Sequence, residues 1–147
     1  MIIRRYKPSD IEAVVAIFRS NIGKYFVEAE EKELREFLEA FSDDYFVIEI
    51  IDEVVAAGGI ALNEDETISL CWGMVRTDLI GTGLGKKLTL FRMEKGREKW
   101  GDRPFVTSTS HHTEGFYKKL GFETVEHTPD GFGPGIDICK MRLALPE

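Results

Sequence analysis

Apolar residues recur along this chain with two different periods, and these periods predict its helices and strands. A spacing of three and four residues, which places side chains on one face of a helix, runs from Ile11 to Ile22 and from Leu34 to Phe41. Two further helices are expected, over 84–100 before Gly101 and over 113–120 before Gly121. Short apolar runs predict strands at 2–6, 45–51, 54–62, 68–75, 104–108, 122–127 and 136–145.

The resulting order is β-α-α-β-β-β-α-β-α-β-β, which predicts an α/β fold. Because runs of strands are mixed with helices, the sheet should be mixed in direction and not doubly wound and parallel. Two local signals refine the predicted boundaries. Ser9 and Glu12 are expected to form a capping box at the first helix, and the Gly- and Pro-rich segment 130–135 is expected to be a loop between the last strands. Strict alternation within 68–75 predicts one face made of Ile68, Leu70, Trp72 and Met74.

Length and charge narrow the function classes. The 147 residues are expected to form one domain, 1–147, that is large enough for a substantial core. A net charge of −7 argues against nucleic acid as a partner, and no apolar run approaches the ~20 residues that cross a bilayer, so no membrane partner is expected. Cys71 and Cys139 are interpreted as buried thiols of a cytoplasmic protein. The three histidines form no metal-ligand pattern, so no metal is expected.

Three glycines within five residues join the strand 68–75 to the helix that follows, where the segment 81–85 reads Gly-Thr-Gly-Leu-Gly. Such a turn exposes backbone N–H groups at a helix N-terminus, a geometry that binds phosphate or pyrophosphate. The spacing fits neither a Walker loop, because Ile80 and Lys87 stand where Gly and Ser or Thr are required, nor a Rossmann fingerprint. The alternative is a tight turn that binds nothing, although such a turn would not require three glycines.

About thirty residues further on, the segment 115–122 reads Gly-Phe-Tyr-Lys-Lys-Leu-Gly-Phe. The glycine turn, this second motif and the order of elements together resemble the GNAT superfamily of acyl-CoA-dependent N-acetyltransferases. The resemblance covers most of the chain in element order and is strongest from 68 to 122. It implies a mixed, mostly antiparallel central sheet flanked by helices, with acetyl-CoA as the cosubstrate.

The resemblance also assigns residues to the cofactor. The family's turn pattern, [Gln/Arg]-x-x-Gly-x-[Gly/Ala], falls on 80–85, with Ile80 off-pattern at its first position. Residues 81–86 would hold the pyrophosphate, largely through main-chain N–H groups, and 73–75 would pair by backbone with the pantetheine arm. Ser110 stands where many members have an Asn that contacts pantetheine. The implied cofactor residues are Gly73, Met74, Val75, Gly81, Thr82, Gly83, Leu84, Gly85, Lys86 and Ser110.

Tyr117 falls on the family's general acid, a phenol that protonates the departing CoA thiolate; the alternative is a tyrosine that only packs beneath its helix. No base is assigned, because Ser69 stands near the strand position where some members carry Glu. His111 and His112 have the intrinsic pKa for that role. They are otherwise simply exposed to solvent, and ordered water can also carry the proton.

Two features concern the acceptor, and each has a plain alternative. The acidic residues from Glu28 to Asp44 are either a solvated helix face or a field that favours a cationic amine. The segment 130–137 is either a strand connector or a border of the acceptor site, as the loop before the last strand commonly is in this fold, with Phe132 and Asp137 shaping the pocket.

The sequence therefore predicts an N-acetyltransferase that moves an acetyl group from acetyl-CoA to a primary amine by direct attack. The competing hypotheses are a catalytically silent acyl-CoA-binding regulatory module and a structural domain that binds no CoA. The amine, on a small molecule or a peptide, is not identified by the sequence. The resemblance also leaves a homodimer through the last strands open.

Overall fold

The computed structural model describes residues 1–145, which contain seven strands and four α-helices. The strands are β1 (Ile2–Arg5), β2 (Tyr45–Ile50), β3 (Glu53–Leu62), β4 (Ile68–Val75), β5 (Phe105–Ser110), β6 (Glu123–Gly133) and β7 (Ile136–Leu143). The helices are α1 (Ile11–Ser20), α2 (Glu31–Ala40), α3 (Leu84–Trp100) and α4 (Glu114–Lys119). Their order along the chain is the predicted one.

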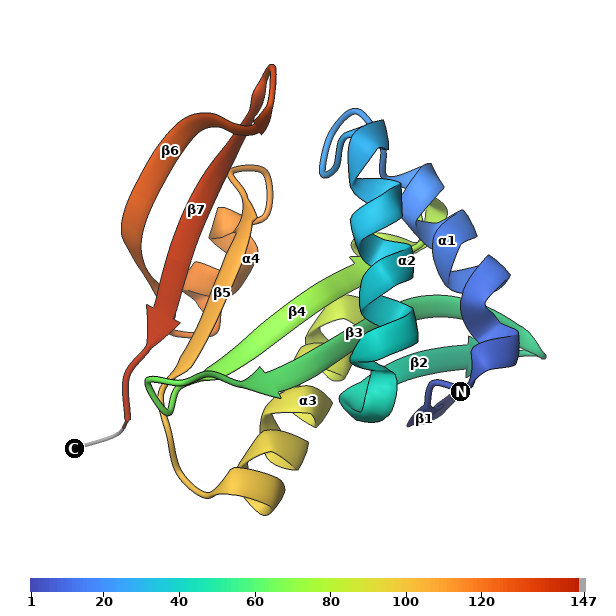
Figure 1. Ribbon diagram of the computed structural model, residues 1–147, viewed down its shortest axis with the longest axis horizontal. Coiled ribbons are helices and arrows are strands. Elements are labelled where there is room, and N and C mark those ends of the chain that lie inside the picture. Colours follow the sequence, from blue (N-terminus) through green and yellow to red (C-terminus); the bar gives the residue numbers. More distant parts are fainter. Residues whose placement is uncertain (146–147) are drawn as a thin grey trace.

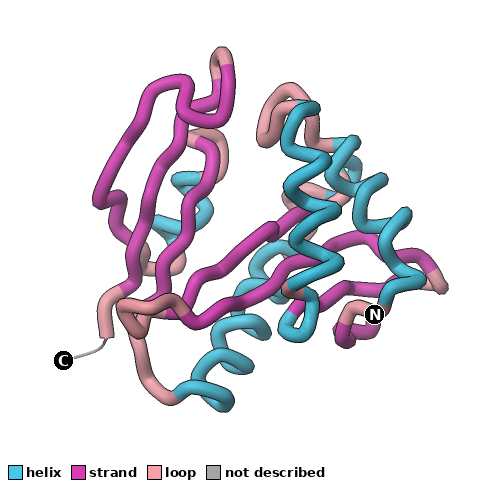
Figure 2. Tube along the Cα trace, viewed as in Figure 1, coloured by secondary structure: helices cyan, strands magenta, loops and turns pink. Residues whose placement is uncertain are grey.

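All seven strands lie in one sheet, in the spatial order β1-β2-β3-β4-β5-β7-β6. Neighbouring strands are antiparallel except β4 and β5, which are parallel. The mixed, mostly antiparallel sheet expected from the sequence is thereby confirmed. Figure 2 shows β5, β6 and β7 diverging from the other four strands, so the sheet opens where β4 and β5 separate.

Two hydrophobic cores lie on opposite faces of the sheet. Figure 1 shows α1 and α2 in front of the sheet and α3 behind it. The front core contains Val14, Val15, Phe18, Leu34, Leu38, Tyr45, Val47, Ala57 and Met74. The rear core includes Ile68, Leu70, Leu84, Leu88, Met93, Phe105, Tyr117 and Phe122. The sheet therefore separates the surroundings of α1 and α2 from those of α3 and α4.

A bulge in β4 breaks its alternation. Cys71 pairs with Gly59 and Met74 pairs with Ala57, so two residues of β4 stand opposite the single Gly58. The first of these two, Trp72, has a φ of 48°, which is rare for a large side chain. Because one residue is inserted, Met74 and Trp72 pack in front while Ile68 and Leu70 pack behind. The prediction of one common face for these four residues was wrong.

The first helix begins differently from the predicted capping box. A 3₁₀ turn, Pro8–Asp10, precedes α1, and the Lys7 N–H donates to the Asp10 carboxylate at 2.9 Å. Arg4 holds the same carboxylate through two hydrogen bonds of 2.8 and 2.9 Å. Glu12 instead pairs with Arg35 on α2. Ser9 and Glu12 therefore do not form the box, because the turn that starts at Pro8 moves the cap to Asp10.

The last hairpin is longer than predicted. Residues 130–133 belong to β6, and only 134 and 135 form the turn to β7. The Asp137 carboxylate accepts a hydrogen bond from the Asp130 N–H at 2.9 Å and contacts His127 Nε2 at 2.7 Å. The Asp130 carboxylate in turn accepts from the Gly135 N–H at 2.7 Å. These side-chain bonds hold together a segment whose glycines indicated a loop.

Removing the Tyr45 hydroxyl should destabilise the fold. Tyr45 is buried on β2, and its hydroxyl donates to the Trp72 carbonyl in the bulge at 2.9 Å. Tyr45→Phe leaves that carbonyl without this donor, so we expect the free energy of unfolding to fall by about 1 to 2 kcal/mol. Urea denaturation measures the change.

Tyr6→Phe is the matched control for this substitution. The Tyr6 ring packs edge-on against Tyr45, and its hydroxyl has no hydrogen-bond partner within residues 1–145. Equal losses in the two variants would show that the bond to Trp72 contributes nothing to stability.

Candidate active site

The separation of β4 from β5 creates a cleft. The two strands pair only at Ile68 with Phe105 and at Ser69 with Val106. At the fork the Thr107 hydroxyl donates to the Leu70 carbonyl at 3.1 Å. Beyond this point the strands diverge around a cleft of about 1150 Å³. The part of β4 that borders the cleft contains the bulge.

The cleft brings the two sequence motifs together. Its lining includes Gly73, Met74, Val75, Gly81, Gly83, Gly85, Lys86, Ser110 and Tyr117, all of them predicted site residues. Two other predicted cofactor residues do not line it. The Leu84 side chain is only 7% exposed and packs in the rear core. The Thr82 hydroxyl donates to the Leu79 carbonyl at 2.5 Å, and the Thr82 N–H is directed to the same oxygen at 3.3 Å.

The glycine turn has the backbone geometry for binding an anion. Gly81 and Gly83 have φ values of 88° and 92°, a region that glycine adopts without steric cost. The first hydrogen bond of α3 runs from the Lys87 N–H to the Gly83 carbonyl at 3.1 Å. The three preceding N–H groups, those of residues 84–86, therefore have no acceptor within the helix. Leu84 contributes its backbone to this turn although its side chain lies in the core.

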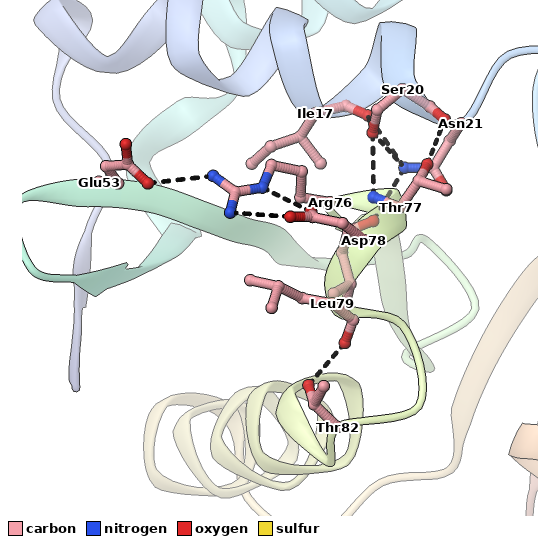
Figure 3. A network of polar contacts seen from close by, with 10 residues as sticks. Ile17, Ser20, Asn21, Glu53, Arg76, Thr77, Asp78, Leu79 and Thr82 are labelled. Carbon is pink, nitrogen blue, oxygen red and sulfur yellow. Dashed lines mark hydrogen bonds and ion pairs between the residues drawn. The ribbon is translucent and has the colours of Figure 1, made fainter.

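A polar network fixes the segment between β4 and the glycine turn (Figure 3). The Asn21 side-chain amide donates to the carbonyls of Ile17 and Val75, both at 2.9 Å, and so joins the end of α1 to the end of β4. Thr77 bonds to Ser20 through its backbone N–H and its hydroxyl. Asn21 also lines the cleft. The sequence analysis missed this residue, because an Asn near the end of a helix is typical of an ordinary terminus.

Tyr117 is buried at the wall of the cleft. Its side chain is 6% exposed and packs edge-on against Phe116 and Phe122, with ring centroids 5.1 and 5.3 Å away. Its hydroxyl has no hydrogen-bond partner in the described part of the chain. The packing fixes the ring, while the hydroxyl keeps its donor capacity for a group inside the cleft.

The two histidines have different surroundings. His111 Nδ1 accepts a hydrogen bond from the Asp137 N–H at 3.0 Å, and His111 is not part of the cleft wall. His112 lines the cleft and contacts the ring of Tyr25, with centroids 6.2 Å apart. Partial burial, together with the nearby His111 and Lys24, lowers the pKa of His112. The direction of this shift favours the neutral imidazole, which is the form that accepts a proton.

Of the two residues expected to shape the acceptor pocket, Phe132 and Asp137, the structure places one at the cleft. Phe132 lines the cleft, near the tip of the last hairpin. Asp137 does not, because its carboxylate binds the backbone of Asp130 and the ring of His127.

The same hairpin approaches the loop between α1 and α2 so closely that a Cβ atom at Gly133 would lie 2.5 Å from Val27 Cγ1.

Two carboxylates of the acidic segment face the cleft. Glu30 and Glu33 line it, on the side of α1 and α2, with the aromatic residues Phe26 and Trp72 beside them. Burial raises the pKa of Glu30, although its carboxylate accepts a hydrogen bond from the Val27 N–H at 3.0 Å.

Glu31 points elsewhere, because Arg19 binds both of its oxygens, at 2.7 and 2.9 Å.

The cysteines do not share one environment. Cys139 is buried, whereas Cys71 is half-buried and lines the cleft, and both are free thiols. Burial raises the pKa of Cys71 to about 11. In residues 1–145 no group of three or more His, Cys, Asp or Glu side chains could hold a metal ion. Within the same residues, no helix has the length and apolarity to cross a membrane.

Comparison with known families identifies the fold and the motifs. The model of the acetyltransferase (GNAT) domain family matches residues 7–145 of this chain. The chain belongs to the GNAT acetyltransferase family. The transferase activity and the family expected from the sequence are thereby confirmed.

Individual relatives of this GNAT domain agree with that result. The uncharacterized N-acetyltransferase YjgM of Escherichia coli (strain K12) is 29% identical over 156 residues, which cover 97% of this chain and 92% of YjgM. Ard1 from Thermoplasma volcanium has the same fold, with a TM-score of 0.83, 18% identity and coverage of 99% of this chain and 98% of Ard1. The structure of yncA from Salmonella typhimurium, which contains its cofactor acetyl-CoA, has a TM-score of 0.75 at 20% identity and covers 100% of this chain and 95% of yncA.

A negative charge in the glycine turn should abolish cofactor binding by this GNAT domain. Gly83→Asp places a carboxylate where an anionic phosphate would bind, so we expect acetyl-CoA to raise the Tm of the wild type and not that of the variant. Gly101→Asp is the matched control, because both glycines have positive φ and open space at the Cβ position, while Gly101 lies at the other end of α3. Thermal unfolding of the wild type and both variants, with and without millimolar acetyl-CoA, measures the shift in Tm, and Gly101→Asp should keep the shift of the wild type. A wild-type Tm that does not respond would contradict the assignment of the turn.

Proposed function

We propose that this protein transfers an acetyl group from acetyl-CoA to a primary amine by direct attack on the thioester. The observation that carries the proposal is that the glycine turn, the bulge of β4 and Tyr117 border one cleft. The yncA structure contains acetyl-CoA, which supports the same cosubstrate here. The acidic residues in the cleft support an amine as acceptor.

The donor binds along α3 and β4. The N–H groups of residues 84–86 and the Lys86 side chain hold the pyrophosphate at the N-terminus of α3. The pantetheine arm follows the edge of β4 that β5 leaves unpaired beyond Ser69, and hydrogen-bonds to the backbone at 73–75. Gly73, which is exposed in the bulge, permits the close approach of the arm. Ser110, at the opposite wall, contacts the arm through its hydroxyl.

In the reaction the neutral amine adds to the thioester carbonyl, and backbone N–H groups of β4 stabilise the oxyanion that forms. His112, directly or through water, accepts the proton that the amine loses. The carbon–sulfur bond then breaks, and the Tyr117 hydroxyl protonates the departing thiolate. The products are an N-acetylated amine and CoA.

The acceptor enters from the side of α1 and α2. Glu30 and Glu33 attract a cationic amine there, and Phe26 and Trp72 provide aromatic faces for it. For Glu30 and Glu33, this arrangement supports the interpretation of the acidic segment as a field that favours a cationic amine. Glu31 belongs to the solvated helix face, where it pairs with Arg19 and Arg35.

Removal of the Tyr117 hydroxyl tests the mechanism. Tyr117→Phe should keep acetyl-CoA binding and lose about 10²-fold in kcat, which is the usual scale for a positioned proton donor. Tyr25→Phe, the other tyrosine of the cleft wall, should keep its kcat. Both are measured by thiol release from acetyl-CoA with a panel of amines. Full activity of Tyr117→Phe would remove it from the mechanism, and a wild type that binds acetyl-CoA but is inert on the whole panel would favour the catalytically silent module.

Neutralising the cleft carboxylates tests the acceptor class. Glu30→Gln combined with Glu33→Gln should raise the KM for a cationic amine several-fold and leave kcat largely intact, because these charges act on binding. The wild-type KM should rise with salt, which screens the attraction over about 10 Å at 0.1 M, and also as the pH falls through the raised pKa of Glu30. Glu36→Gln on the exposed face of α2 is the control. A KM indifferent to salt and to the double substitution would leave this segment a solvated face.

A further inference from the structure

Arg92 on α3 is a buried cation that has no anionic partner among the described residues. Its side chain is 2% exposed. It takes part in none of the ion pairs formed within residues 1–145. A buried guanidinium cannot be deprotonated and is costly unless it is paired. Arg92 is therefore a positive charge for which residues 1–145 supply no counter-charge.

The hydrogen bonds of this guanidinium are few and long. Arg92 Nη1 donates to the Gly59 carbonyl and Nη2 to the Thr89 hydroxyl, each at 3.3 Å. The Nε atom is buried and has no partner within the described residues. A guanidinium carries five N–H donors. Most of the donor capacity of Arg92 is therefore unused by the described chain.

The nearby titratable groups do not supply the missing charge. Cys71 remains a neutral thiol at pH 7, because burial raises its pKa to about 11. Burial likewise raises the pKa of Tyr45 well above its ordinary value. The carboxylate of Asp44 is bound by Lys99 at 2.7 Å. Any anion that neutralises Arg92 must come from outside these groups.

Two glycines place the guanidinium at the bulge. A Cβ atom at Gly58 would lie 2.9 Å from Arg92 Cζ, and one at Gly73 would lie 2.8 Å from Nη2. Arg92 therefore lies directly against the backbone of the bulge, and it forms part of the cleft wall. Gly73 is also the residue at which the pantetheine arm of the donor approaches β4 in the proposed function.

The position of Arg92 in the fold indicates which part of which substrate lies near its guanidinium. Arg92 follows Gly85 by seven residues, or about 10 Å along α3, so it is too far along the helix to share the pyrophosphate site at the N-terminus. It lies on the α3 side of the sheet, whereas Glu30 and Glu33 lie on the side of α1 and α2. An acceptor with a carboxylate would meet those two acids first. The anion that pairs with Arg92 therefore belongs to the acyl end of the donor.

We propose that the part of the cleft between the β4 bulge and Arg92, which we call the acyl subsite, accepts an acyl chain that ends in a carboxylate. Arg92 is the counter-charge of that carboxylate. Malonyl and succinyl thioesters of CoA are donors of this class. The inference rests on the proposed CoA-dependent transfer and extends the donors of that same site. The step is unchanged: a carbon–nitrogen bond forms, the carbon–sulfur bond breaks, and the carboxylate is retained in the amide product.

Matched pairs of donors test this proposal by isothermal titration calorimetry. Succinyl-CoA and butyryl-CoA have acyl chains of the same length and differ in a terminal carboxylate or methyl group, as do malonyl-CoA and propionyl-CoA. In the wild type, the carboxylate of at least one pair should tighten binding by about tenfold or more, the scale of a charge-assisted hydrogen bond. Free CoA and acetyl-CoA are titrated first. If neither binds, the proposed function fails together with this inference, whereas binding of CoA with no preference in either pair overturns the inference alone.

Two substitutions locate the source of the preference. Arg92→Met removes the charge and keeps an unbranched apolar side chain, so it should abolish the preference for the carboxylate while free CoA still binds. Arg92→Lys retains the charge and should retain part of the preference. A preference for the carboxylate that persists in Arg92→Met overturns the proposal. An equal loss of kcat/KM with acetyl-CoA and succinyl-CoA in this variant also overturns it, because such a loss would place Arg92 at the reacting carbonyl. If Arg92→Met does not fold, the comparison of the matched donors in the wild type still tests the proposal.

Discussion

The short pairing of β4 with β5 is the constraint on which the rest of this structure depends. Only two residue pairs join these strands, and the Thr107 hydroxyl extends the contact to Leu70. Beyond the fork β4 keeps backbone donors and acceptors on one edge that no strand of the described chain satisfies. An unpaired edge is normally a liability in a sheet. Here it faces a cleft, and in the proposed function an extended cofactor arm completes the hydrogen bonding of that edge. The incomplete sheet and the proposed binding site are then the same feature.

The sheet also separates two kinds of charge. On the α3 side the cleft is bordered by free helix N–H groups, Lys86 and the buried Arg92, which favour anions. On the side of α1 and α2 it is bordered by Glu30 and Glu33, which favour cations. In the proposed function, the anionic donor and the cationic acceptor therefore approach the bulge from opposite faces without competing for the same groups. The bulge is the point where the two approaches meet.

Local signals predicted most of the fold, and long-range contacts explain what they missed. The order of elements followed from hydrophobic period, and the positive φ values of Gly81 and Gly83 agree with the reason for interpreting that segment as a special turn. The bulge was not predictable, because it depends on how β4 aligns with β3. Glu31 could not be separated from Glu30 without knowing that Arg19 reaches it. Arg92 resembles the other charged residues of α3 in the sequence, and only the folded structure shows that it is buried and packed against Gly58 and Gly73.

The bulge gives the protein a built-in optical reporter. The chain contains two tryptophans, Trp72 and Trp100. The indole of Trp72 lies on the cleft wall and stacks on Phe26, with ring centroids 5.9 Å apart, while its own carbonyl is held by Tyr45. Trp100 is the last residue of α3 and is not part of that wall. Ligands that displace water from the cleft therefore change the surroundings of one fluorophore and leave the other as a constant background, so occupancy can be followed in the unlabelled protein.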